Sequence, residues 1–196
     1  MDRKTFLQTS AALAVGGILG DSIINKVSAA ETPHSATDGA LDFPIMDLQI
    51  VPKANGYGED VMIWEYATYI DDAEAFMEHN MAHYLNILTG DEPLDIFACP
   101  LLLPYCIERK YNRLWTKKRL QRIIDAAKAR DIAIEISDMM RVPDEEFILM
   151  AKRAGLKFTF GSDTRDEKTG RLDYCRRVAV RCGLKKEDMF VPKRKL

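Results

Sequence analysis

The chain has 196 residues, a mass of 22.3 kDa and 47% hydrophobic residues. This size and composition are ordinary for one soluble globular domain. The formal net charge is −2, and basic residues are not interleaved with aromatic ones. The sequence therefore has no basic surface typical of nucleic-acid binding, and nucleic acid is not an expected partner.

The first 30 residues have the order of an export signal. A charged segment with Arg3 and Lys4 precedes the weakly apolar run 11–20, and small residues at 27–30 offer a cleavage site. The segment resembles a twin-arginine signal in which lysine replaces the second arginine. The apolar run is too short to span a bilayer. We expect an exported, periplasmic or extracytoplasmic protein with no membrane span in the mature chain. The alternative is a cytoplasmic protein with an amphipathic N-terminus.

The expected domain follows a linker. Residues 31–42 are small and polar and predict that linker, which places the domain at 43–192. A first strand is expected at 45–51, and the β-branched and aromatic residues of 61–70 predict a second strand or hairpin arm. A helix is expected over 71–88, because its first turn is acidic and apolar residues recur at helical spacing.

From residue 94 onwards, predicted strands and helices alternate. The strands are expected at 94–99, 132–136 and 157–160. The helices are expected after a Thr116 cap, from Pro143 to Gly155, and over 172–182. Short connections between such elements predict right-handed crossovers and a parallel sheet, which is an α/β fold.

Polar residues follow the ends of these three strands. Cys99 follows the first strand. The second ends in Ser137 and Asp138, and the third in Ser162 and Asp163. The carboxyl ends of parallel strands meet at one edge of a sheet, where α/β proteins place their sites. We therefore expect Cys99, Asp138 and Asp163 to share one site.

Two of the acidic residues have alternative interpretations. Glu135 lies within an otherwise apolar strand, and a buried carboxylate needs a partner. It is therefore either a ligand or a structural hydrogen-bond anchor. Asp163 is either a ligand or a turn residue that caps the next helix, and only the shared edge favours the first interpretation.

The four cysteines fall into two pairs. Cys175 and Cys182 follow the apolar stripe of their predicted helix, so we expect buried thiols. Seven residues of helix also hold them too far apart for a disulfide. Cys99 and Cys106 lie at a strand end and in the loop after it, and a disulfide between them is left open.

His79 and His83 are spaced like paired metal-binding histidines on a helix. They project away from the apolar face of that helix, however, and no glutamate follows His79 in the pattern His-Glu-x-x-His. We expect both to be exposed.

A family resemblance covers about half of the chain, residues 92–192. The segment Ile134-Glu135-Ile136, Pro143 and the run 147–163, which ends in Gly-Ser-Asp, resemble the C-terminal half of the polymerase-and-histidinol-phosphatase (PHP) domain. Residues 95–100 resemble the strand of that family that ends in a His-Pro ligand. The resemblance implies a shortened or partial PHP-type distorted TIM-like (β/α) barrel with parallel strands. It also implies divalent metal ions, zinc or manganese, and hydrolysis of phosphate esters.

The resemblance supplies the expected metal ligands. Asp163 matches a ligand of the family, and Cys99 stands where the family has the histidine of the His-Pro turn. Glu135 and Asp138 are the further candidates. Arg165 replaces the histidine of Gly-Ser-Asp-x-His, and the N-terminal His-x-His motif is absent. We therefore expect one ion at most, at low occupancy or absent.

Three arginines form a candidate anion site. Arg141, Arg165 and Arg171 fall in predicted loops near the same edge, and a guanidinium binds phosphate or carboxylate in bidentate fashion. Ordinary solvated loop arginines are the alternative.

Two functions follow from these residues and the resemblance. The first is a metal-dependent phosphoesterase or hydrolase acting on phosphorylated small molecules. The second is a non-catalytic relic that binds an anionic small molecule or a partner protein. A third, structural role as a homo-oligomer is suggested by a shortened sheet with uncovered strands.

Overall fold

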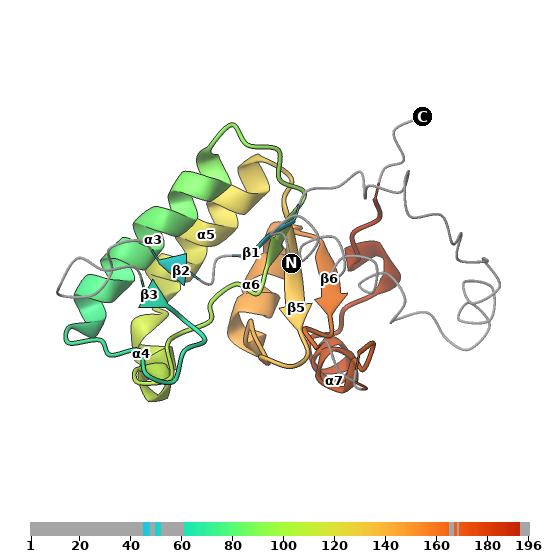
Figure 1. The fold of residues 1–196 in the computed structure, drawn as a ribbon. Helices are drawn as coiled ribbons and strands as arrows, with labels where there is room; N and C mark the ends of the chain where they lie inside the picture. The colour runs from blue at the N-terminus through green and yellow to red at the C-terminus, as the bar shows by residue number, and fades with distance from the viewer. Residues whose placement is uncertain (1–44, 48–49, 52–60, 165–166, 168, 193–196) are drawn as a thin grey trace, which may run out of the picture.

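A computed structural model describes residues 45–47, 50–51, 61–164, 167 and 169–192. In this part of the chain a four-stranded sheet, a two-stranded hairpin and five α-helices are present (Figure 1). The expected export signal at 1–30 and the linker at 31–42 lie outside the described residues.

The central sheet is parallel throughout, as the sequence predicts. Its order is β1 (Ile45–Asp47), β4 (Ile96–Ala98), β5 (Ala133–Ser137) and β6 (Phe158–Gly161). Helix α5 (Lys117–Ala129) connects β4 to β5, and α6 (Glu145–Ala154) connects β5 to β6. The expected α/β class is confirmed. Within the described residues, however, β1 and β6 are the edges of an open sheet and no barrel is formed.

The N-terminal strands differ from the prediction. The expected strand at 45–51 is two strands, since β1 joins the main sheet whereas β2 (Ile50–Val51) pairs antiparallel with β3 (Val61–Met62). The expected strand or hairpin arm at 61–70 is an arm of two residues only. The chain turns after this arm, and the Glu65 backbone N–H and the Thr68 hydroxyl both donate to the Met62 carbonyl oxygen, at 3.2 and 2.8 Å.

The helices begin at side-chain caps. Asp72 caps α3 (Ala73–Thr89), and Thr116 caps α5 as expected. Asp144 caps α6, so Pro143 precedes the cap and does not open the helix, which corrects the prediction. The remaining helices are α7 (Asp173–Arg181), the unpredicted α4 (Tyr111–Leu114) and the 3₁₀ turns η1 (Glu108–Lys110) and η2 (Lys186–Asp188).

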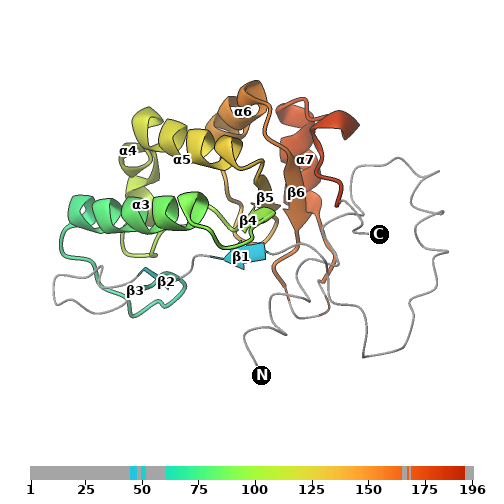
Figure 2. The same cartoon turned by 90° about the horizontal axis from the view of Figure 1, so that it is seen from above.

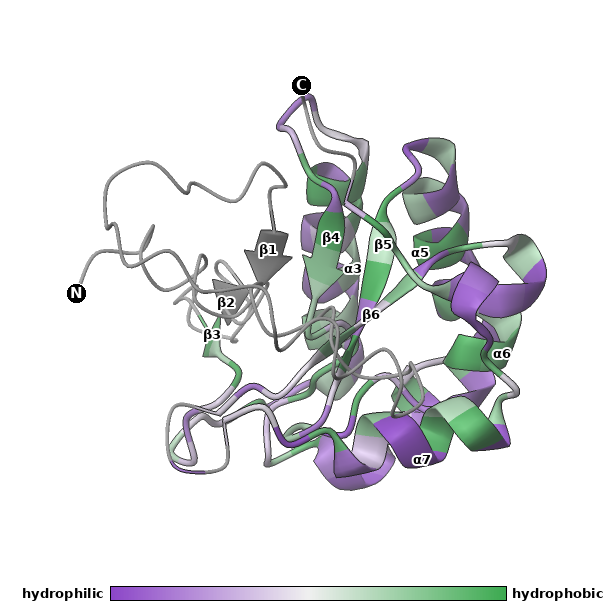
Figure 3. Cartoon of the chain, turned by 90° about the vertical axis from the view of Figure 1, so that its right-hand side faces the viewer, coloured by the Kyte–Doolittle hydropathy of each residue, from purple (hydrophilic) through white to green (hydrophobic). Residues whose placement is uncertain are grey.

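Helices α3, α5 and α6 lie on one side of the sheet (Figure 2). The apolar side chains that alternate along the strands form a core with these helices, and Figure 3 shows the hydrophobic residues along β4 and β5. Phe97, Ile134 and Phe158 belong to this core. Residues of the opposite face of the sheet, including Glu135, Ser137 and Thr159, are also buried. Helix α7 lies beyond the carboxyl ends of β5 and β6 (Figure 1).

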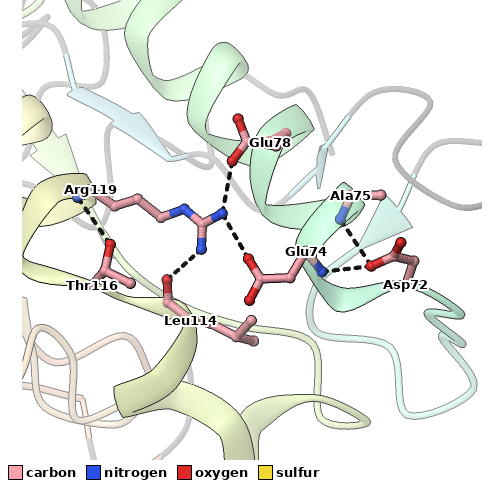
Figure 4. A network of polar contacts seen from close by, with 7 residues as sticks. All are labelled: Asp72, Glu74, Ala75, Glu78, Leu114, Thr116 and Arg119. Carbon is pink, nitrogen blue, oxygen red and sulfur yellow. Dashed lines mark hydrogen bonds and ion pairs between the residues drawn. The ribbon is translucent and has the colours of Figure 1, made fainter.

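One arginine joins the two long helices (Figure 4). Arg119, near the start of α5, donates to Glu74 Oε2 at 2.9 Å and to Glu78 Oε1 at 2.8 Å, both on α3. It also donates to the Leu114 carbonyl oxygen at 2.9 Å. The side chain of Arg119 is only 12% exposed, so its charge is held by these acceptors rather than by water. We call these three residues the Arg119–Glu74–Glu78 cluster.

Within the described residues, no helix is both long enough and apolar enough to cross a lipid bilayer.

Candidate metal centre

Three potential metal ligands converge from three neighbouring strands. Cys99 follows β4, Glu135 lies within β5, and Asp163 follows β6. One ligand atom of each lies within 4.8 Å of the others. Cys99 Sγ donates a hydrogen bond to Asp163 Oδ2 at 3.0 Å, and the Cys99 backbone N–H donates to Glu135 Oε2 at 3.0 Å. These three residues form the Cys99–Glu135–Asp163 cluster.

The strand register explains how Glu135 reaches this cluster. Glu135 pairs with Thr159, and Ser137 pairs with Gly161, so these four residues share one face of the sheet. A Cβ atom at Gly161 would overlap Glu135 Oε1. The absence of a side chain at 161 therefore makes the space that the Glu135 carboxylate fills.

Ser137 holds the Asp163 carboxylate. Its Oγ donates to Asp163 Oδ2 at 2.5 Å and accepts from the Met140 backbone N–H at 3.1 Å. Oδ2 of Asp163 therefore accepts two hydrogen bonds, one from the Cys99 thiol and one from the Ser137 hydroxyl. Both donors are uncharged.

Two residues of the cluster have an unusual backbone conformation. Cys99 has φ 47° and Asp163 has φ 55°, both in the left-handed region. Non-glycine residues adopt it at a cost in free energy, which is lower for aspartate, and such residues concentrate at functional sites. The two turns thereby aim the thiol and the carboxylate towards each other.

The cluster is mostly buried. Cys99 is 3% exposed, Glu135 is 4% exposed, and Asp163 is half-buried. Burial of two carboxylates is costly unless their charge is compensated. A bound cation is one way to compensate it.

The donor set fits one divalent ion. A thiolate and two carboxylates are common zinc ligands, at about 2.3 Å for sulfur and 2.0–2.2 Å for oxygen. Donor atoms 3.0–4.8 Å apart can reach one ion with small movements. Three protein ligands leave the fourth tetrahedral position open, as in catalytic zinc sites. The cluster can therefore hold one metal ion.

Asp138 is not part of this cluster, contrary to the prediction. Its Oδ1 accepts a hydrogen bond from the Cys175 backbone N–H, in the first turn of α7, at 3.0 Å. Asp138 instead caps α7, although the two are distant in the sequence. A negative charge is favourable at the start of a helix.

The structure describes the candidate anion site only in part. Arg165 lies outside the described residues. Arg141 is exposed in the loop after β5, and Arg171 is exposed and 3.9 Å from Asp173. No described contact links Arg141 or Arg171 to the Cys99–Glu135–Asp163 cluster.

The other cysteines and the histidines are mostly where they were expected. Cys175 and Cys182 are buried and free, and burial raises the pKa of both thiols. Cys106 is free and exposed, so no disulfide joins it to Cys99. His79 is exposed as predicted, whereas His83 is half-buried.

No protein-family model, no curated protein and no solved structure matches the chain.

Proposed function

We propose that this chain is an exported, PHP-like hydrolase that holds one divalent metal at Cys99, Glu135 and Asp163 and acts on phosphorylated small molecules. One observation carries the proposal: ligand atoms from three adjacent parallel strands lie within 4.8 Å of one another at the carboxyl edge of the sheet. That edge is where α/β proteins place their active sites.

Zinc is the metal that this donor set favours. Sulfur ligands select zinc over manganese, which prefers oxygen donors. When bound, the ion would supply a Lewis acid for a phosphoryl oxygen and an activated water. Cys99, Glu135 and Asp163 would hold it, and Ser137 would orient Asp163 through the 2.5 Å hydrogen bond.

The finer features of the proposal rest on the sequence. The PHP-like segments at 95–100 and 134–163 support a shortened barrel of that family, and the first 30 residues support export. The parallel order β4-β5-β6 is compatible with such a barrel segment.

A second candidate is a non-catalytic relic that binds an anionic small molecule or a partner protein. The hydrogen bonds within the cluster favour it, because Cys99 and Ser137 together satisfy Asp163 Oδ2 without a cation. A site that has lost its metal would be stabilised by such bonds.

Metal content and turnover distinguish the two candidates. The full chain is purified, its bound metal is measured, and a generic phosphate ester is assayed with added zinc or manganese. The hydrolase predicts about one zinc per chain and turnover that Asp163→Asn abolishes. The exposed Asp173→Asn serves as the control and should change neither. Metal well below one per chain together with no turnover would exclude the enzyme.

A further inference from the structure

Thr159 carries a buried hydroxyl group in β6. The residue is 3% exposed, and its Oγ1 has no hydrogen-bond partner among the described residues. A buried donor without a partner destabilises the folded chain, so such groups are few in native proteins and often belong to a catalytic or ion-binding site. Valine has a similar shape and no hydroxyl to desolvate, so packing alone gives no reason for threonine at this position.

The register of the sheet places this hydroxyl beside Glu135. Thr159 and Glu135 are direct partners on β6 and β5, adjacent strands that lie about 4.8 Å apart (Figure 1). Both side chains therefore leave the same face of the sheet. The neighbours of Thr159, Phe158 and Phe160, belong to the core on the other face.

The Glu135 carboxylate leans across towards the strand of Thr159. Its Oε1 occupies the space where a Cβ atom at Gly161 would lie, two residues along β6 on the same face. Its Oε2 accepts the hydrogen bond from the Cys99 backbone N–H at 3.0 Å. One oxygen is thus held from the end of β4, and the other lies over β6, the strand that carries the Thr159 hydroxyl.

Asp163, the other carboxylate of the Cys99–Glu135–Asp163 cluster, shows what such a hydroxyl can do. Ser137 on β5 donates from its Oγ to Asp163 Oδ2 at 2.5 Å. A hydroxyl of the neighbouring strand therefore orients Asp163. Thr159 stands in a comparable relation to Glu135, because its hydroxyl belongs to the strand next to that carboxylate.

We propose that Thr159 is a positioning residue of the metal centre, and that its Oγ1 donates a hydrogen bond to the Glu135 carboxylate when that carboxylate holds zinc. The inference rests on the proposed metal centre. Ligand atoms up to 4.8 Å apart must move towards one ion, so the Glu135 carboxylate changes position on binding. Rotation about one side-chain bond lets the Thr159 hydroxyl follow it. Ligating carboxylates are usually hydrogen-bonded in this way, which fixes their orientation.

The zinc affinity of the full chain, measured by competition with a chelating dye, tests this role. Thr159→Val keeps the shape of the side chain and removes the hydroxyl, so zinc affinity should fall about 10–100-fold, the effect typical of a lost outer contact. Thr159→Ser keeps the hydroxyl and should bind zinc nearly as tightly as the original chain. Thr89→Val makes the same substitution at an exposed position at the end of α3 and should leave zinc affinity unchanged.

The stability of the zinc-free chain separates a positioning role from a structural one. Because Oγ1 of Thr159 has no partner in the described part of the chain, Thr159→Val should leave the urea midpoint of unfolding unchanged or raise it. A hydroxyl that holds the fold together would give the opposite result, a lower midpoint. Lost zinc affinity without lost stability is therefore the expected signature of Thr159.

The possible failures can be told apart. If the original chain binds zinc and Thr159→Val binds it equally well, the inference is wrong and the metal centre stands without it. A lower urea midpoint for zinc-free Thr159→Val would make the residue structural, and an equal loss of zinc affinity in Thr159→Ser would assign the effect to packing of the methyl group. Absence of zinc binding by the original chain would remove the metal centre itself, and the inference with it.

Discussion

Two clusters of charged side chains in this protein are satisfied in different ways. In the Arg119–Glu74–Glu78 cluster, a guanidinium contacts two carboxylates, and opposite charges compensate each other. In the Cys99–Glu135–Asp163 cluster, Oδ2 of Asp163 accepts hydrogen bonds from a thiol and a hydroxyl, both neutral. The first cluster joins α3 to α5, whereas the second lies at the carboxyl edge of the sheet.

The difference separates a structural contact from a candidate metal centre. Glu74 and Glu78 are 52% and 70% exposed, so water can replace Arg119 as their partner at modest cost. Glu135 is 4% exposed, and its carboxylate is far more costly to leave uncompensated. The Asp163 carboxylate accepts from two neutral donors, and such a carboxylate retains the capacity to bind a cation.

The largest expected effect comes from Gly161→Ala, which alters the candidate metal centre without removing a proposed ligand. The new Cβ would overlap Glu135 Oε1 and push the carboxylate out of place. We expect zinc affinity, measured by competition with a chelating dye, to fall by more than the 10–100-fold typical of a lost outer contact. The free energy of unfolding should fall by about 1–3 kcal/mol through overpacking.

Ser162→Ala is the matched control for Gly161→Ala, because Ser162 is the next residue and is also buried. It should leave zinc affinity unchanged. Normal zinc binding by Gly161→Ala would contradict the role given to Glu135.

A smaller effect is expected from Arg119→Ala, which removes the contact between α3 and α5. The variant loses two charged hydrogen bonds and one to the Leu114 carbonyl oxygen. We expect the free energy of unfolding to fall by about 1–2 kcal/mol, since the acceptors become accessible to water. Urea titration measures this loss, and Arg122→Ala, an exposed arginine of the same helix, should cost much less.

The pH dependence of stability checks the same contact. The hydrogen bond from Arg119 lowers the pKa of Glu78 below its usual 4.5. A lowered pKa in the folded state adds stability above pH 4.5, and this stability is lost as the pH falls through the folded-state value. Arg119→Ala should therefore lose less stability between about pH 5 and pH 3 than the original chain. Equal losses in both proteins would show that Glu78 gains nothing from Arg119.

The smallest effect is expected from Asp138→Ala, which tests the correction made to the ligand set. Loss of the bond to the Cys175 backbone N–H should lower the free energy of unfolding by about 1 kcal/mol. Asp138→Asn should retain most of that stability, because asparagine also caps helices well. Both variants should bind zinc like the original chain. A fall in zinc affinity for Asp138→Asn would show that Asp138 is a metal ligand after all.

Much of the sheet and part of the site were predictable from local patterns. The strands β4, β5 and β6 lie close to where the apolar runs placed them, since the alternation of strand and helix requires parallel pairing. Cys99 and Asp163 follow from the rule that parallel strands deliver their carboxyl ends to one edge. Glu135 was ambiguous, and the structure supports both interpretations, because its carboxylate lies in the cluster and also accepts a hydrogen bond from the Cys99 backbone N–H.

Other features depended on contacts between distant residues. Nothing in the sequence around Asp138 shows that it caps α7, because the N–H group it binds is 37 residues away. Ser137 was visible as a polar strand end, but its bond to Asp163 required the register of β5 and β6. The turn that ends β3 is held by hydrogen bonds from the Glu65 backbone N–H and the Thr68 hydroxyl to the Met62 carbonyl oxygen, which the β propensity of 61–70 did not reveal.

The amino-acid sequence alone determined the class of fold and the edge at which polar residues collect, because periodicity and strand direction are local properties. Tertiary structure alone decided which of those residues meet. Whether a carboxylate faces the centre or caps a helix depends on which side of a strand it leaves from. It also depends on the space that a neighbouring strand provides, as Gly161 does for Glu135.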